Sequence, residues 1–201
     1  VEKVFSKAKS KPIYIIKSTV LPGSTKKLSE KYPNFKVIFS PEFLTERTAK
    51  LDMLTQSRII LGGKKQIVDQ VEKIFIRRFK NKNIIKTDSV TAELIKYMNN
   101  SFFATKVSIM NEFKLLSDKI GANWDDALFG FATDGRIGDS HLNVPGHDGK
   151  LGYGGTCFPK DVNSLLSFSK KYNIELNSIA GGWATNLKVR PEKDWEKKEG
   201  R

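Results

Sequence analysis

The sequence lacks several features from which function is often inferred. Among 201 residues there are one cysteine and two histidines, so we expect neither an internal disulfide nor a metal site of cysteine and histidine ligands. No apolar run is long enough to span a bilayer, and the first residues resemble no signal peptide. We therefore expect a cytoplasmic protein that does not associate with a membrane.

Negative charge is also scarce. The 35 Lys and Arg residues exceed the 22 Asp and Glu residues, and the formal net charge is +13. A nucleic-acid-binding protein would concentrate this charge on one element. Here the lysines are spread over several helix faces, and residues 188–201 mix both signs. This spread leads us to expect no nucleic-acid partner. Strongly salt-dependent binding to nucleic acid would indicate the opposite. We interpret the excess as attraction for a small anionic substrate.

The first half of the sequence alternates expected strands with expected helices. Short runs rich in β-branched and aromatic residues predict strands at residues 13–16, 37–39, 58–61 and 83–86. Apolar residues at helical spacing predict a helix over residues 64–79. This alternation is typical of an α/β fold with a parallel sheet covered on both faces. We assign residues 1–88 to this sheet domain.

The pattern changes after residue 88. Residues 89–120 contain no proline or glycine, which predicts one long helix. Its apolar positions at helical spacing are Leu94, Met98, Phe102, Ile109, Phe113, Leu116 and Ile120. Helices of this length often lie at a domain junction or a subunit interface. We therefore expect a helical second domain over residues 89–187, a homodimer formed through helix 89–120, and a tail or linker over residues 188–201.

The second domain carries an irregular segment that is rich in glycine. Further helices are predicted at residues 124–131, 160–172 and 174–187, and residues 134–155 fit no regular element. Glycines allow a backbone to wrap closely around a ligand. We expect a binding loop here, and we assign no chemistry to His141 and His147.

The single thiol follows this segment directly. Cys157 lies in the run Gly-Tyr-Gly-Gly-Thr-Cys-Phe-Pro-Lys-Asp, residues 152–161, just before an expected helix. A helix N-terminus favours a thiolate, and Pro159 suits the first helical turn. The alternative is a small buried apolar residue. The glycines and Lys160 favour an activated nucleophile.

The run around Cys157 resembles the catalytic-cysteine signature of the UDP-glucose/GDP-mannose dehydrogenase family. Other stretches resemble the same family in the same order: residues 18–25 (STVLPGST), 40–46 (SPEFLTE), 92–100 (AELIKYMNN) and 134–138 (DGRIG). Complete members begin with a βαβ unit that carries Gly-x-Gly-x-x-Gly, a motif not found here after any expected strand, and end with a third domain. The resemblance therefore implies a partial chain, with the second half of a Rossmann-like parallel sheet before the helical central dimerisation domain.

The resemblance also implies roles for individual residues in substrate binding and covalent chemistry. Cys157 would form the covalent intermediate. Lys96 and Asn100, which are four residues apart and so share a helix face, would bind the substrate and stabilise an oxyanion. Glu42 and Gly154 would also contact the substrate. Without the resemblance, an exposed lysine at Lys96, a helix-weakening asparagine at Asn100 and a solvated carboxylate at Glu42 would be the favoured interpretations.

The remaining implied roles concern water, cofactor and the neighbouring subunit. Thr19 would position a water near the nicotinamide, and Asp161 would support that water. Glu46 would contact the cofactor and help to activate the water, and Lys160 would lie near the cofactor phosphates. Arg136, whose planar fork suits an anion, would reach the sugar-nucleotide site of the neighbouring subunit.

The resemblance implies an NAD-dependent four-electron oxidation of UDP-glucose to UDP-glucuronate, through a thiohemiacetal and a thioester on Cys157. GDP-mannose is the alternative substrate, and residues 135–138 favour UDP-glucose. A noncatalytic dimerisation or sugar-nucleotide-binding module is the alternative function.

Overall fold

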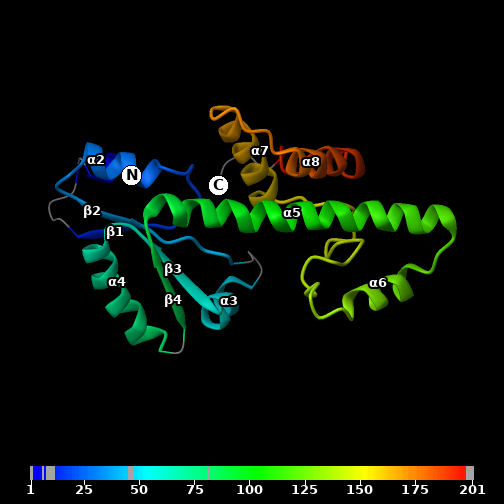
Figure 1. Cartoon of the computed structure of the whole chain (residues 1–201), viewed down its shortest axis with the longest axis horizontal. Coiled ribbons are helices and arrows are strands. Elements are labelled where there is room, and N and C mark those ends of the chain that lie inside the picture. The colour runs from blue at the N-terminus through cyan, green and yellow to red at the C-terminus, as the bar shows by residue number, and fades with distance from the viewer. Residues whose placement is uncertain (1, 6, 8–11, 45–47, 81, 198–201) are drawn as a thin grey trace. The chain divides into compact units, whose positions relative to one another are not determined.

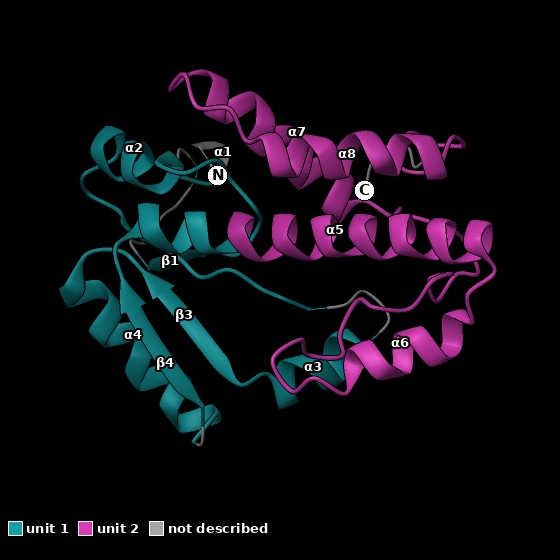
Figure 2. Cartoon of the chain, turned by 45° about the vertical axis from the view of Figure 1, so that its right-hand side comes forward, with its two compact units in different colours: residues 1–96 teal, residues 97–201 magenta. Residues whose placement is uncertain are grey.

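A computed structural model describes residues 2–5, 7, 12–44, 48–80 and 82–197 of the chain (Figure 1). The chain divides into two compact units, residues 1–96 (unit 1) and residues 97–201 (unit 2), which Figure 2 shows in different colours. The boundary falls within helix α5 (Ser89–Ile120), so this helix begins in unit 1 and continues in unit 2. The domain division at residue 88 stays a prediction.

Unit 1 contains a sheet and the helices that precede and follow its strands. Its described strands lie in the order β1 (Ile13–Ile16), β2 (Lys36–Phe39), β3 (Arg58–Gly62) and β4 (Asn83–Thr87). Its other helices are α1 (Glu2–Phe5), α2 (Ser24–Lys31), α3 (Ala49–Thr55) and α4 (Lys65–Arg78). β1 is parallel to β2, and β3 is parallel to β4. The expected α/β class is confirmed.

The central strand pair corrects the expectation of a fully parallel sheet. β2 and β3 are antiparallel and meet at one pair, Phe39 with Gly62. A parallel pair needs a crossover connection that returns the chain to its starting edge, usually through a packed helix. α3, which lies between these strands, has no buried residue, so it does not act as a packed crossover helix. The chain therefore enters β3 in the opposite direction, and the sheet is mixed.

Apolar cores cover both faces of the sheet in unit 1. The core against α4 consists of Ile38, Ile59, Leu61, Val68 and Val71. The core against the start of α5 consists of Phe39, Ile60 and Ala92. Neighbouring strand residues thus face opposite layers, as the period of a strand requires. β3 and α5 lie so close that a Cβ added to Gly62 would meet Ala92.

Unit 2 consists of helices around the remainder of α5. They are α6 (Trp124–Ala132), α7 (Cys157–Lys170) and α8 (Asn177–Val189), each within a few residues of its predicted bounds. One core joins α5, the end of the glycine-rich segment and α7 through Ala104, Tyr153 and Val162. A second joins α5 to the middle of that segment through Met110, Leu142 and Val144. The segment is irregular in backbone but anchored by buried apolar side chains.

The residues after α8 also pack within unit 2 as far as they are described. The Arg190 side chain is buried, and the ring of Trp195 lies 5.4 Å from that of Trp183. No helix in the described part of the chain combines the length and apolar content needed to cross a membrane.

Candidate active site

In unit 1, the candidate residues follow the parallel strands β1 and β2. Thr19 is half-buried in the segment after β1, and Glu42 is exposed in the segment after β2. Lys96 of α5 is buried, and its Nζ donates to the backbone oxygen of Glu42 at 2.6 Å. The same Nζ lies 5.2 Å from the ring centre of Phe43. Glu46 lies outside the described residues.

A second lysine binds the main chain at the same edge of the sheet. Lys17 Nζ donates to the backbone oxygen of Ser40 at 3.2 Å. Burial lowers the pKa of Lys17, and the nearby charge of Glu42 opposes this shift. Two ammonium groups thus hold the backbone of residues 40–42, and they add positive charge to an edge where parallel strands commonly collect ligand sites.

The segment that carries Thr19 is tied to α5 by a carboxylate that the sequence analysis did not identify. Glu93 is fully buried and accepts from the backbone N–H of Gly23 at 2.6 Å and from that of Thr25 at 2.8 Å. It also accepts from the Thr25 hydroxyl at 2.6 Å. These donors belong to the N-terminus of α2, where a negative charge is stabilised.

In unit 2, three candidate residues meet at a buried carboxylate. Asp161 is 1% exposed, and its Oδ2 accepts from Asn100 Nδ2 at 2.6 Å. Its Oδ1 forms an ion pair with Lys160 Nζ at 3.0 Å. The amide binds one carboxylate oxygen by a charge-assisted hydrogen bond, whereas the other oxygen has this ion pair but no hydrogen bond among the described residues.

Cys157 lies one helical turn before Asp161, with its thiol exposed. It is the first residue of α7, so the helix begins slightly earlier than predicted and includes the cysteine. Pro159 occupies the first turn and is buried. The free N–H groups of that turn face the N-terminal end of the helix, where they suit an anionic ligand.

Arg136 and Gly154 lie in the glycine-rich segment. Arg136 is exposed, and its Nε donates to Asp134 Oδ1 at 2.9 Å. This contact raises the pKa of Arg136 and lowers that of Asp134. Gly154 approaches Arg190 and Asp194 so closely that an added Cβ would lie 2.6 Å from the Asp194 carboxylate. The implied substrate contacts of both residues stay predictions.

His141 packs as an aromatic ring. Its ring stacks on Phe103 at 4.4 Å between centroids, and burial and then the charge of Lys106 lower its pKa. Lys106 also donates to the backbone oxygen of Gly138 at 2.8 Å, which ties the segment around Arg136 to α5.

Sequence reasoning missed four buried polar side chains that hold these segments: Glu93, Asn111, Asn186 and Arg190. Asparagine weakens a helix interior, so Asn111 and Asn186 within helical patterns were a usable signal of a special role. Nothing in the local pattern distinguishes Glu93 or Arg190 from exposed charged residues.

Comparisons with known proteins identify the family. Residues 1–80 match the NAD binding domain of the UDP-glucose/GDP-mannose dehydrogenase family, and residues 90–187 match the central domain of the same family. The chain is 40% identical over 185 residues to a UDP-glucose 6-dehydrogenase of Rickettsia bellii, covering 89% of this chain and 41% of that protein. It is 38% identical over 179 residues to that of Campylobacter jejuni, covering 88% and 44%.

Solved structures give the same result. A UDP-D-ManNAc dehydrogenase from Pyrococcus horikoshii superposes with a TM-score of 0.79 at 27% identity, over 94% of this chain and 44% of that one. A UDP-glucose dehydrogenase from Pyrobaculum islandicum gives 0.77 at 28% identity, over 87% and 40%. The chain spans less than half the length of these relatives. Two domains of one family match in order along the sequence, and the chain belongs to the UDP-glucose/GDP-mannose dehydrogenase family.

Proposed function

We propose that this chain forms part of an NAD-dependent nucleotide-sugar 6-dehydrogenase that oxidises UDP-glucose to UDP-glucuronate, with Cys157 as the nucleophile. The observation that carries the proposal is the exposed thiol of Cys157 at the start of α7, one turn before a buried Asp161 bound by Asn100. UDP-glucose is favoured over GDP-mannose because relatives at 35% to 40% identity are named UDP-glucose 6-dehydrogenases.

The chain offers donors that suit a dinucleotide. The hydroxyl of Thr19 follows β1, and the side chain of Lys160 stays 55% exposed while it pairs with Asp161. An ammonium has three donors, so Lys160 can bind a phosphate oxygen as well as Asp161. When bound, NAD accepts the hydride that leaves the substrate carbon.

Cys157 makes the second oxidation possible. The Cys157 thiolate adds to the aldehyde carbon formed in the first oxidation, which creates a C–S bond and places negative charge on the former carbonyl oxygen. Loss of hydride from this thiohemiacetal gives a thioester. Attack by water then breaks the C–S bond, releases the thiolate and leaves a carboxylate. Overall, one primary alcohol loses four electrons as two hydrides.

Five other residues assist these steps in the proposal. Lys96 and Asn100 stabilise the charge on the oxygen, as donors fixed in place before the reaction do most effectively. Asp161 and Thr19 position the attacking water, and Glu46 helps to activate it. The existing bonds of Lys96 to the Glu42 backbone and of Asn100 to Asp161 support this role, because they hold both side chains in place.

The rate at which iodoacetamide alkylates Cys157 tests the proposal, since the chain has a single thiol. We expect rapid alkylation near neutral pH that saturating UDP-glucose slows. Cys157→Ser is the control and should take up no label. Protection by GDP-mannose but not by UDP-glucose would transfer the assignment to the other substrate. Slow alkylation that neither nucleotide changes would contradict the catalytic proposal and favour a noncatalytic dimerisation module.

The proposed enzyme is a homodimer formed through α5. Large apolar side chains stay exposed along this helix, with Met98 at 60%, Phe102 at 66% and Ile120 at 68%. Exposed apolar side chains in a continuous row commonly mark a protein interface. Arg136 is exposed as well, which supports its proposed role at the site of the neighbouring subunit.

A further inference from the structure

Two buried asparagines hold the backbone that leads to Cys157. Asn186 of α8 is 0% exposed and forms a reciprocal pair with Tyr153: its Oδ1 accepts from the Tyr153 N–H at 2.7 Å, and its Nδ2 donates to the Tyr153 carbonyl at 3.0 Å. Asn111 of α5 is 2% exposed, and its Oδ1 accepts from the Gly152 N–H at 2.9 Å. Consecutive residues of one loop are thus bound from two helices.

The loop packs closely against α8. Gly152 has φ +66°, and a Cβ there would collide with Asn186 and would lie 3.1 Å from Val189. The ring of Tyr153 is buried in the core with Ala104 and Val162. Only Gly154, Gly155 and Thr156 separate this anchored point from Cys157. Glycine has the least restricted backbone, so the position of Cys157 depends on how firmly residues 152 and 153 are held.

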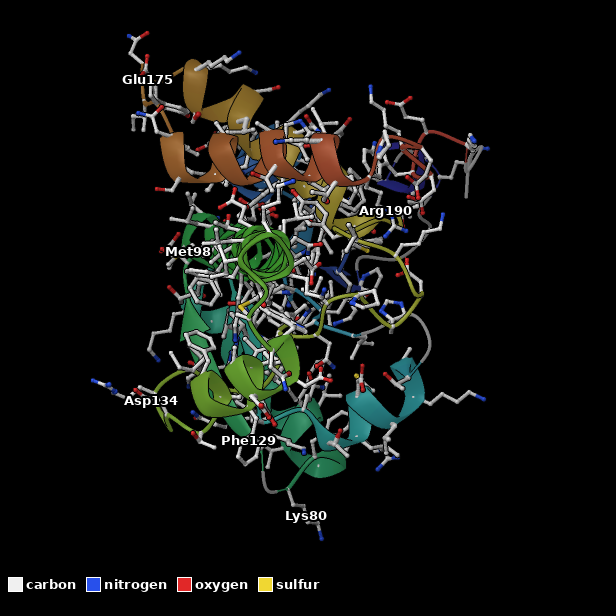
Figure 3. All side chains as sticks on the ribbon, turned by 90° about the vertical axis from the view of Figure 1, so that its right-hand side faces the viewer. Lys80, Met98, Phe129, Asp134, Glu175 and Arg190 are labelled. Atoms are coloured by element: carbon white, nitrogen blue, oxygen red, sulfur yellow. The ribbon has the colours of Figure 1, made fainter. Side chains whose placement is uncertain are left out.

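Arg190 provides a further contact to the same loop. Arg190, which follows α8 (Figure 3), is 2% exposed and donates to Asp194 at 2.7 Å through Nε and to Asp148 at 2.7 Å through Nη2. Its Nη1 also donates to the Leu151 carbonyl at 3.3 Å. The loop is therefore fixed just before Gly152 as well, and Asp194 also accepts a hydrogen bond from the backbone of Gly155.

We propose that Asn111 and Asn186 are positioning residues for Cys157: by binding the backbone of Gly152 and Tyr153, they hold the cysteine where the sugar nucleotide meets it. This inference rests on the proposed function. Neither asparagine contacts the thiol, so both act through the loop. An apolar side chain at either position would leave buried backbone groups without partners, which is costly.

Hydrogen–deuterium exchange of the peptide that contains residues 152–157 tests the loop itself. We expect Asn186→Ala and Asn111→Ala to raise its exchange rate about tenfold, because each removes hydrogen bonds of ordinary strength. Asn163→Ala is the matched control. This exposed asparagine of α7 donates to the Pro159 carbonyl and should leave the peptide unchanged. Unchanged exchange in both loop variants would overturn the proposal.

Asn186→Asp keeps the proposal testable if the alanine variants fold poorly. When ionised, the new carboxylate accepts from the Tyr153 N–H but opposes the Tyr153 carbonyl, whereas the protonated carboxyl donates to that carbonyl as the asparagine does. Burial raises the pKa of a carboxyl, so we choose about pH 8 and about pH 5, which lie on either side of a raised carboxyl pKa. The exchange rate of Asn186→Asp in excess of that of the unsubstituted chain should be smaller at the lower pH. An excess that stays constant over this range would contradict the proposal that Asn186 holds the loop.

Protection of Cys157 by UDP-glucose separates positioning from mere folding. In Asn186→Ala, the UDP-glucose concentration that halves the alkylation rate should rise about tenfold, while far-ultraviolet circular dichroism stays unchanged. Faster exchange without this rise would overturn the positioning role. If UDP-glucose gives no protection in the unsubstituted chain, the proposed function fails, and the exchange measurements still decide whether the asparagines hold the loop.

Discussion

At the scale of single residues, buried polar side chains hold the candidate site. Asp161 is nearly inaccessible, so its carboxylate depends on Asn100 and Lys160 instead of on water. Burying a charge is unfavourable unless it is paired and hydrogen-bonded. The residues proposed for chemistry in unit 2 are therefore also residues that stabilise the fold.

Asn100→Leu should destabilise the chain for this reason. The substitution leaves Asp161 Oδ2 without its amide donor, and we expect a loss of about 1–3 kcal/mol in the free energy of unfolding. Urea denaturation measures this loss, with Asn143→Ala at an exposed asparagine as the control. Adding Asp161→Leu should recover part of the stability, since no buried charge remains. If Asn100→Leu and the control have equal free energies of unfolding, Asp161 does not depend on the amide of Asn100.

The contacts of Arg190 predict a response to acid. The hydrogen bond from Arg190 holds the pKa of Asp194 below its ordinary value. A carboxyl group whose pKa is lowered by folding stabilises the folded state at pH values above its ordinary pKa of about 3.9. This stabilisation is lost as the pH falls through the lower pKa of the folded state. Asp194→Asn should therefore lower the melting temperature at about pH 7, and the difference should shrink toward about pH 3. In an Arg190→Met background the difference should depend less on pH, because the largest cause of the lowered Asp194 pKa is removed.

At the scale of elements, periodicity predicted α4 to α8 to within a few residues, gave no bounds for α1, α2 and α3, and predicted strand direction poorly. The bounds of α5 agree with the prediction, because residues 89–120 lack breakers and Gly121 leaves the helix with φ +72°. The direction of β3 was missed, because strand and helix patterns do not state whether a linking helix packs on the sheet. In α3, Leu51 is 60% exposed and Leu54 53% exposed, although both are apolar in sequence.

Glu93 links two elements and offers a direct test of that link. Glu93→Ala would leave the N–H groups of Gly23 and Thr25 without their acceptor at the start of α2. We expect a loss on the order of 3 kcal/mol in the free energy of unfolding, because the lost acceptor is charged and buried. Glu175→Ala, at an exposed residue between α7 and α8 (Figure 3), is the control and should change stability by less than about 0.5 kcal/mol. A loss no larger than that of the control would show that α2 needs no carboxylate.

At the scale of the whole molecule, sequence motifs identified the family but not the contacts that hold its segments. The resemblance rests jointly on the residues around Cys157 and on residues 18–25, 40–46, 92–100 and 134–138. The course of residues 134–155 was not predictable, because it is set by side chains of other elements, such as Lys106 on the Gly138 carbonyl. Long-range contacts of this kind leave no local period in the sequence.

The apolar face of α5 leads to a prediction about assembly. Phe102 and Phe113 are exposed at 66% and 54% and lie at helical spacing with Met98, Ile109 and Ile120. Such a face is stabilised when a second copy removes it from water. We expect the chain to sediment as a dimer and the Phe102→Glu/Phe113→Glu variant to sediment as a monomer, because two buried carboxylates without partners would oppose association.

The control for this test is Ile74→Glu on α4. Ile74 is 63% exposed and lies on another helix, so its replacement changes charge and surface apolarity without altering the face of α5. Dimers should therefore persist in this variant, and circular dichroism should show equal helix content in all three proteins. A chain that is monomeric before any substitution, or a double variant that dimerises as well as the control, would contradict the dimer proposed through α5.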